Sequence, residues 1–146
     1  MIRSAYVIRQ VDGADEFDAL RELQEPFKVE MPIVDTSDGR WWIAYRNDIP
    51  AAFLGMIAST HYPNAGYFKR VGVLPEHRGY GLQARLMRAM ERSARRSGLE
   101  LIVSDTTDNV PSANNFVRSG WLMFVPEYPW SFPQSLYWRK DLRLDT

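Results

Sequence analysis

Cysteine is absent from this chain of 146 residues. The absence excludes disulfides, a thiolate nucleophile and a cysteine-ligated metal site, and it fits a reducing compartment, so we expect a cytoplasmic protein. The two histidines, His61 and His77, stand without cysteines or a nearby pair of acids, and we therefore predict no metal site.

An excess of charge of one sign is also lacking, because 18 Lys and Arg residues balance 18 Asp and Glu residues. No global field therefore favours nucleic acid or an acidic membrane surface. No apolar run approaches the roughly 18 residues of a membrane span, and the first six residues lack the apolar core of a secretory signal. We expect neither a nucleic-acid partner nor a membrane partner.

The length and the ordinary composition, with 45% hydrophobic residues, predict one globular domain over residues 1–146. Alternating or apolar segments predict strands at 5–11, 40–46, 49–61, 67–73, 99–104, 121–125 and 135–142. Apolar residues at helical spacing predict helices over about 12–24, 80–97 and 110–119, with Asp12 as the first N-cap. This order predicts an α/β (α+β) fold: a mixed, mostly antiparallel sheet of about seven strands flanked by helices on both faces.

The segment Arg78-Gly79-Tyr80-Gly81-Leu82-Gln83 lies between a predicted strand and the longest predicted helix. Glycine lets backbone N–H groups turn toward one point. The helix start adds unpaired N–H groups and a partial positive charge, and Arg78 adds a full one. These parts together predict a site for a pyrophosphate.

The loop and a second segment resemble the GNAT superfamily of acyl-CoA-dependent N-acyltransferases. The loop is similar to the family pattern Arg/Gln-x-x-Gly-x-Gly/Ala. Asn109, Ser112, Phe116 and Gly120-Trp121 resemble the family segment Asn-x-x-(small)-x-x-x-Tyr/Phe-x-x-x-Gly-Phe. The resemblance covers roughly residues 5–142 and implies a GNAT fold, in which the strands at 67–73 and 99–104 splay to leave a cofactor slot.

This resemblance implies acetyl-CoA, that is, acylated coenzyme A, as the co-substrate. The backbone of Val71, Gly72 and Val73 would pair with the pantetheine arm, and glycine in a strand permits close backbone approach. Asn109 would hydrogen-bond the same arm, and Phe116 would lie near the acetyl and thiol end. The residues that would hold the pyrophosphate are Arg78, Gly79, Tyr80, Gly81, Leu82 and Gln83.

Two positions depart from the family pattern. Gln83 stands where glycine or alanine is usual. We expect its side chain to point away from the pyrophosphate, because the groups that would bind the phosphate there are backbone N–H groups. Phe116 stands where many relatives carry a tyrosine that protonates the leaving thiolate, and a phenyl ring has no such proton.

The catalytic groups must come from other positions. The absence of cysteine and of a nucleophile elbow favours direct attack by the amine without a covalent intermediate. No acid stands in the strand 67–73, so Asp105 and Asp108 are the nearest candidates for the base, with helix capping as the alternative role. Tyr128 is the candidate acid, with packing or pocket lining as its alternative.

Acceptor-binding candidates lie on three segments. Glu30, in the loop 26–32, could contact a cationic amine. The resemblance implies that Tyr67 stands on the strand 67–73 where the family often places a carboxylate base. Trp130 and Phe132 lie in a proline-rich loop and are candidates to line the acceptor pocket. Trp41 and Trp42 are strand neighbours that face opposite sides, so both cannot line one pocket.

The sequence therefore predicts an N-acetyltransferase that moves an acetyl group from acetyl-CoA to a primary amine of a small molecule or peptide, in a ternary complex. A catalytically weak or inactive acyl-CoA-binding regulatory module of the same fold is the alternative, and it would explain Phe116 and the missing strand acid. A nucleotide binder is disfavoured because the P-loop Lys-Ser/Thr and the third glycine of a dinucleotide site are absent. A homodimer is the default for an enzyme of this size.

Overall fold

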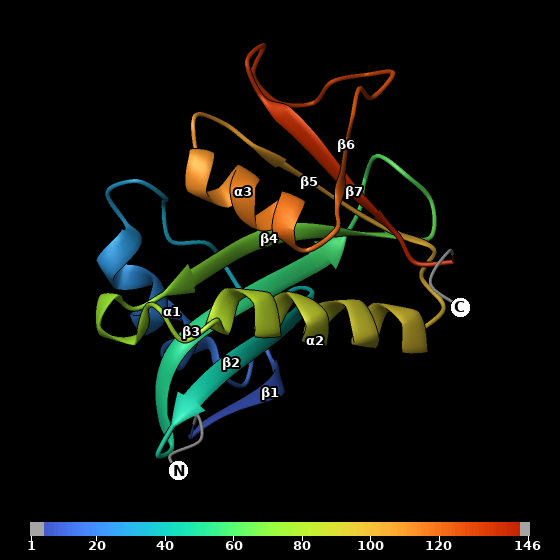
Figure 1. Ribbon diagram of the computed structural model, residues 1–146. Coiled ribbons are helices and arrows are strands. Elements are labelled where there is room, and N and C mark those ends of the chain that lie inside the picture. Colours follow the sequence, from blue (N-terminus) through green and yellow to red (C-terminus); the bar gives the residue numbers. More distant parts are fainter. Residues whose placement is uncertain (1–4, 144–146) are drawn as a thin grey trace. The chain divides into compact units, whose positions relative to one another are not determined.

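The computed structural model describes residues 5–143 (Figure 1), and residues 1–4 and 144–146 of the predicted domain lie outside this range. The described chain forms seven strands, three α-helices and two short 3-10 turns. Their bounds are β1 (Tyr6–Asp12), α1 (Phe17–Gln24), η1 (Glu25–Phe27), β2 (Arg40–Arg46), β3 (Ile49–Ala58), β4 (Ala65–Val73), η2 (Pro75–His77), α2 (Leu82–Arg96), β5 (Leu101–Thr106), α3 (Val110–Arg118), β6 (Leu122–Phe124) and β7 (Leu136–Asp141).

The strands form one mixed sheet in the order β1-β2-β3-β4-β5-β7-β6. The β1–β2, β2–β3, β5–β7 and β6–β7 pairs are antiparallel, and β4 and β5 are parallel. A parallel pair needs a long crossover, which α2 provides. The predicted α/β fold class is confirmed. Within residues 5–143, no helix combines the length and hydrophobicity that a membrane span requires.

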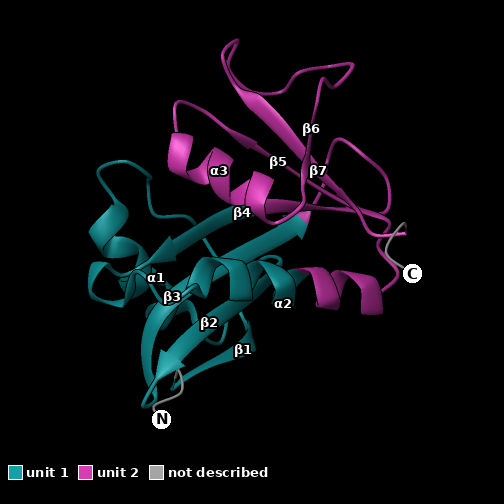
Figure 2. Cartoon of the chain, in the orientation of Figure 1, with its two compact units in different colours: residues 1–57, 69–90 teal, residues 58–68, 91–146 magenta. Residues whose placement is uncertain are grey.

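The described chain divides into two compact units (Figure 2). Unit 1 comprises residues up to 57 together with 69–90, and unit 2 comprises 58–68 together with the residues from 91 onward. Both β4 and α2 contribute residues to each unit. Unit 1 therefore carries the end of β4, the glycine loop and the start of α2, and unit 2 carries β5, α3, β6 and β7.

The core of unit 1 packs α1 against the β1–β3 meander. Leu20, Leu23, Trp41, Ile43 and Phe53 form one buried cluster. The indole N–H of Trp41 donates to the Asp38 carbonyl at 2.8 Å, so this buried ring satisfies its polar atom. Neighbouring Trp42 is also buried. Both tryptophans thus serve the core, from opposite faces of β2.

Aromatic rings dominate the core of unit 2. The Phe116 ring stacks on Trp138 with centroids 5.4 Å apart and meets Trp121 edge-on at 4.9 Å. Phe68 of β4 packs on both Phe116 and Trp121. Such pairs are worth about 0.5–1.5 kcal/mol each beyond the burial of their area. They hold α3 against the strands of its own unit.

The first helix begins later than the sequence predicts. Asp12 is the last residue of β1, and its Oδ1 accepts hydrogen bonds from the Ala14 and Asp15 N–H groups at 2.8 and 3.0 Å. An aspartate that bonds the backbone just ahead of it makes a turn, which competes with helix formation. The prediction of Asp12 as the helix N-cap is therefore wrong, and α1 begins at Phe17.

Gly72 of β4 is required by the packing of unit 1. A Cβ on Gly72 would lie 2.5 Å from Cε1 of the buried Phe53 and 2.9 Å from Cε2 of Phe27, which packs against the same core cluster. We expect Gly72→Ala to lower the free energy of unfolding by about 1–3 kcal/mol, the usual cost of overpacking. Urea unfolding measures the loss, with Lys69→Ala at an exposed position of the same strand as the control. An unchanged midpoint for Gly72→Ala would contradict this packing account.

Candidate functional site

The loop between β4 and α2 presents two glycines in the left-handed backbone region. Gly79 has φ 86° and Gly81 has φ 72°. Side chains other than glycine adopt these angles at a cost. A Cβ built on either residue meets no atom of the described chain within 4 Å. The backbone thus requires glycine at both positions, and the space on their Cβ side is open to a ligand.

The start of α2 adds backbone N–H groups to this loop in unit 1, and we call the segment from Arg78 to Gln83 the cradle. The Arg85 N–H donates to the Gly81 carbonyl at 3.1 Å, which is the first hydrogen bond of the helix. The N–H groups of Leu82, Gln83 and Ala84 precede it and have no intrahelical acceptor. No acid stands in the first turn, so the positive end of the helix dipole is not neutralised from within the helix. The combination suits a phosphate.

Tyr80, between the two glycines, is held by side chains from β1 and the β2–β3 hairpin. Its ring lies against Tyr6 with centroids 5.3 Å apart, and the Arg46 guanidinium lies 5.8 Å from its centroid. Arg46 also donates to the Tyr6 hydroxyl at 3.4 Å, and this bond raises the pKa of Arg46. The same hydroxyl bonds His77 Nδ1 at 2.8 Å. Sequence reasoning missed Tyr6 and Arg46, because no local pattern links them to residue 80.

The ladder between β4 and β5 is short. It pairs Ala65 with Leu101, Gly66 with Ile102 and Tyr67 with Val103. At its end the Ser104 hydroxyl donates to the Phe68 carbonyl at 2.8 Å. β4 then continues to Val73 within unit 1, where the predicted pantetheine-binding residues Val71, Gly72 and Val73 lie.

A second cluster, in unit 2, is centred on Asp105 near the end of β5. The Tyr67 hydroxyl donates to Asp105 Oδ2 at 2.6 Å, and the Trp130 indole N–H donates to the same oxygen at 2.9 Å. The His61 ring stacks on Trp130 with centroids 4.3 Å apart. The fold thus joins Tyr67, Asp105 and Trp130, three residues that were predicted separately.

The two donors leave one oxygen of Asp105 available. Burial raises the pKa of Tyr67, and the bond to Asp105 raises it further, so the phenol keeps its proton and remains a donor at neutral pH. Within the described residues, both hydrogen bonds to the carboxylate end on Oδ2. Oδ1 of this half-buried side chain accepts no hydrogen bond from the described residues.

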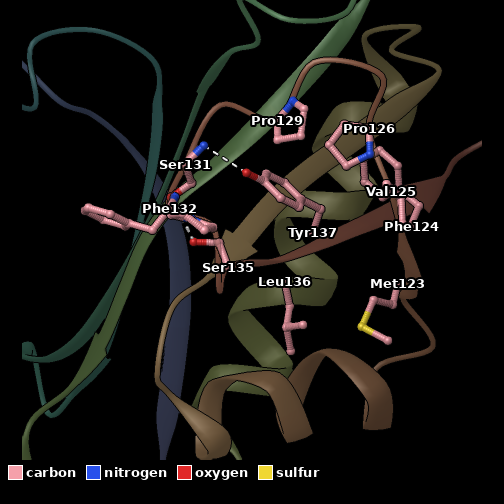
Figure 3. A pocket seen from close by; sticks show the side chains of 11 residues that line it. Met123, Phe124, Val125, Pro126, Pro129, Ser131, Phe132, Ser135, Leu136 and Tyr137 are labelled. Atoms are coloured by element: carbon pink, nitrogen blue, oxygen red, sulfur yellow. Dashed lines mark hydrogen bonds between the residues drawn. The ribbon is translucent and has the colours of Figure 1, made fainter.

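The remaining catalytic and acceptor candidates make no hydrogen bond to the Asp105 cluster within the described residues. Asp108 is exposed, and its Oδ2 accepts from Gln134 at 3.2 Å. Tyr128 is 79% exposed, and Glu30 is also exposed. Phe132 is 63% exposed and lines a pocket formed by β6, β7 and the segment that connects them (Figure 3). These four residues share no hydrogen bond with Asp105 in the described chain.

Asn109 and Phe116 lie at the start and inside of α3. The Asn109 side-chain carbonyl accepts from the Ser112 N–H at 3.1 Å and so caps the helix. Phe116 is buried in the aromatic core of unit 2 rather than exposed at the helix surface.

A family model described as the acetyltransferase (GNAT) family matches residues 8–121. This match covers well over half of the chain and includes the cradle, Asp105 and Phe116. The chain belongs to the GNAT family. The resemblance predicted from the two sequence motifs is confirmed, and the comparison with curated proteins gives no match for this GNAT protein.

Solved structures agree with the fold of this GNAT protein. A candidate acyl-CoA N-acyltransferase from Klebsiella pneumoniae is 21% identical with a TM-score of 0.75, over 96% of this chain and 99% of the other. A candidate acetyltransferase from Salmonella typhimurium, solved with its cofactor acetyl-CoA, is 19% identical with a TM-score of 0.73, over 95% of both chains. A GNAT acetyltransferase from Staphylococcus aureus is 19% identical with a TM-score of 0.70, over 93% and 99%.

Proposed function

We propose that this GNAT protein is an N-acetyltransferase that moves an acetyl group from acetyl-CoA to a primary amine of a small molecule or peptide. The observation that carries the proposal is the cradle, in which two left-handed glycines open onto the unpaired N–H groups of α2. Acetyl-CoA, when bound, supplies an acetyl group activated as a thioester. Its pyrophosphate carries the negative charge that this cradle suits.

Backbone groups of unit 1 would bind acetyl-CoA, the acetyl donor. The N–H groups of the segment from Gly79 to Gln83 would hold the pyrophosphate, with Arg78 at its exposed edge. The backbone of Val71, Gly72 and Val73 would pair with the pantetheine arm. The Val73 N–H would also polarise the thioester oxygen, and one well-aimed donor of this kind is worth about 3–4 kcal/mol.

The acceptor side uses the carboxylate of Asp105. Its free Oδ1 would accept a proton from the incoming ammonium group, while Tyr67 and Trp130 fix the carboxylate through Oδ2. The neutral nitrogen then attacks the thioester carbon, a C–N bond forms, and the C–S bond breaks with its electron pair on sulfur. The proton that the nitrogen loses on forming the amide balances the charge of the departing thiolate.

The leaving thiol needs little help from an acid. Its pKa resembles that of a free thiol, about 8.5, so thiolate is a tolerable leaving group near neutral pH. The buried Phe116 ring offers no proton. Tyr128 stays the predicted acid, and its side chain is exposed.

The change in thermal stability with each ligand tests whether the protein binds acetyl-CoA. We expect acetyl-CoA and CoA at 100 times their dissociation constants to stabilise the fold by roughly 2.7 kcal/mol, and ATP or NAD at the same concentrations to stabilise it far less. Thermal unfolding with each ligand gives the comparison. No shift with either CoA species would refute the donor site. Stabilisation by CoA without thiol release across a broad amine panel would instead support the regulatory-module alternative.

A further inference from the structure

Tyr6, at the start of β1, bonds to residues on both sides of the cradle. Its hydroxyl is hydrogen-bonded to His77 Nδ1 at 2.8 Å, and its ring meets the His77 ring edge-on with centroids 5.6 Å apart. His77 ends η2, directly before the cradle begins at Arg78. After the cradle, in the first turns of α2, Arg85 Nη2 donates to the Tyr6 carbonyl at 3.2 Å. Tyr6 is only 4% exposed, so it makes these contacts inside unit 1.

Tyr80, in the middle of the cradle, packs on the same tyrosine. The centroids of the Tyr80 and Tyr6 rings are 5.3 Å apart. The Arg46 guanidinium lies 5.4 Å from the Tyr6 centroid and 5.8 Å from the Tyr80 centroid. Arg46 stands opposite Tyr6 in the β1–β2 register and donates to its hydroxyl at 3.4 Å. A hydroxyl has one donor and two acceptor sites, so it can bond Arg46 and His77 together. We call Tyr6, Arg46, His77 and Tyr80 the Tyr6 cluster.

The two glycines of the cradle do little to fix its conformation. Gly79 and Gly81 are exposed, and no described atom lies within 4 Å on the Cβ side of either. Glycine also loses more conformational freedom than any other residue when its backbone becomes fixed. A loop that a ligand must order binds more weakly than a loop that is already ordered. Contacts from outside the loop therefore decide how well the cradle binds, and the Tyr6 cluster supplies such contacts before, within and after it.

We propose that Tyr6 and Arg46 are positioning residues for acetyl-CoA, which hold Tyr80 and the N–H groups of the cradle in the binding conformation before the ligand arrives. The inference rests on the proposed function, because the cradle is assigned there as the pyrophosphate site. The apparent affinity of a ligand falls in proportion to the fraction of the protein that is in the binding conformation. Loss of the Tyr6 cluster therefore weakens acetyl-CoA binding although the cradle residues themselves are unchanged.

Two variants outside the cradle test this role. Tyr6→Phe removes only the hydroxyl, and Arg46→Gln, at a half-buried position, removes the cation. We expect each to raise the Kd of acetyl-CoA about three- to tenfold in calorimetry, the range that corresponds to the net loss of one hydrogen bond. Arg9→Gln is the matched control. Arg9 lies 5.3 Å from the centroid of Tyr45, on the opposite face of the same two strands, so its loss should leave the Kd unchanged.

Backbone order in the ligand-free protein separates this inference from the proposed function. NMR relaxation gives the order parameters of the Gly79 and Gly81 amides. We expect values close to the rigid level of about 0.85 in the wild type and in Arg9→Gln, and a fall toward about 0.6 in Arg46→Gln and Tyr6→Phe. Arg46→Gln alone carries the test if Tyr6→Phe does not fold.

The outcomes distinguish the two proposals. A fall confined to the variants of the Tyr6 cluster supports the positioning role even where the wild type binds no acetyl-CoA, and in that case the proposed function alone fails. Order parameters that are already low in the wild type, that stay high in both cluster variants, or that fall equally in Arg9→Gln overturn the positioning role. An unchanged Kd in cluster variants of a protein that binds acetyl-CoA also overturns it.

Discussion

Asparagine in place of Asp105 is expected to lower kcat for amine acetylation by at least about 100-fold, the lower range for the loss of a general base. The amide keeps nearly the same shape and can still accept from Tyr67 and Trp130 through its oxygen. Its other end becomes an NH₂ group, which cannot take a proton from an ammonium head. Steady-state assays of thiol release with acetyl-CoA and a primary amine measure the effect.

Asp108→Asn provides the matched comparison for this prediction. Asp108 lies three residues later in the chain, is exposed, and bonds Gln134 rather than Tyr67 or Trp130. We expect its substitution to change kcat less than about threefold, within the usual range for an exposed side chain without a role in proton transfer. The dissociation constant of acetyl-CoA should stay constant in both variants. A large loss with Asp108→Asn, or full activity with Asp105→Asn, would assign the base to another group.

Alanine in place of Gly81 is expected to weaken acetyl-CoA binding about tenfold or more. The φ of 72° is costly for any residue with a Cβ, so the loop must strain or turn its N–H groups away from the ligand. The methyl group also enters the open space that the pyrophosphate would occupy. Loss of one hydrogen bond to a charged group costs about 1.5–3 kcal/mol, which corresponds to a factor of roughly 10 to 100 in affinity.

Gly98→Ala controls for the backbone strain in this experiment. Gly98 follows α2 at the other end, has φ 82°, and a Cβ there also meets nothing within 4 Å. Both variants should therefore lose a similar free energy of unfolding, about 1 kcal/mol. Only Gly81→Ala should raise the dissociation constant of acetyl-CoA, as measured by calorimetry. Equal weakening in the two variants would show that general destabilisation, and not the cradle, controls binding.

The cradle was predictable from the sequence because its parts are contiguous. A loop from Arg78 to Gln83 that precedes an amphipathic helix fixes where the N–H groups gather, whatever the rest of the chain does. The fold class followed for a similar reason, since hydrophobic periodicity and turn residues report the order of strands and helices. Both predictions depend on interactions within a few residues.

The Asp105 cluster was predictable only as separate residues. Tyr67 stands 38 positions before Asp105, and Trp130 stands 25 positions after it, so their convergence depends on the pairing of β5 with its neighbours. Arg46 and Tyr6 were missed beside Tyr80 for the same reason. The N-cap assigned to Asp12 was wrong because a local Asx turn uses the same residue type as a helix cap.

We propose direct acetyl transfer from acetyl-CoA to a primary amine, with no acyl-enzyme. Its most direct test is a single-turnover experiment with ¹³C-labelled acetyl-CoA and a panel of primary amines, in which mass spectrometry measures both the amines and the intact protein. We expect all the label released from CoA to appear on the amine, and we expect the protein mass to stay unchanged. Labelled protein before the amine is added, or bound acetyl-CoA that is never transferred to any of a broad panel of primary amines, would contradict it.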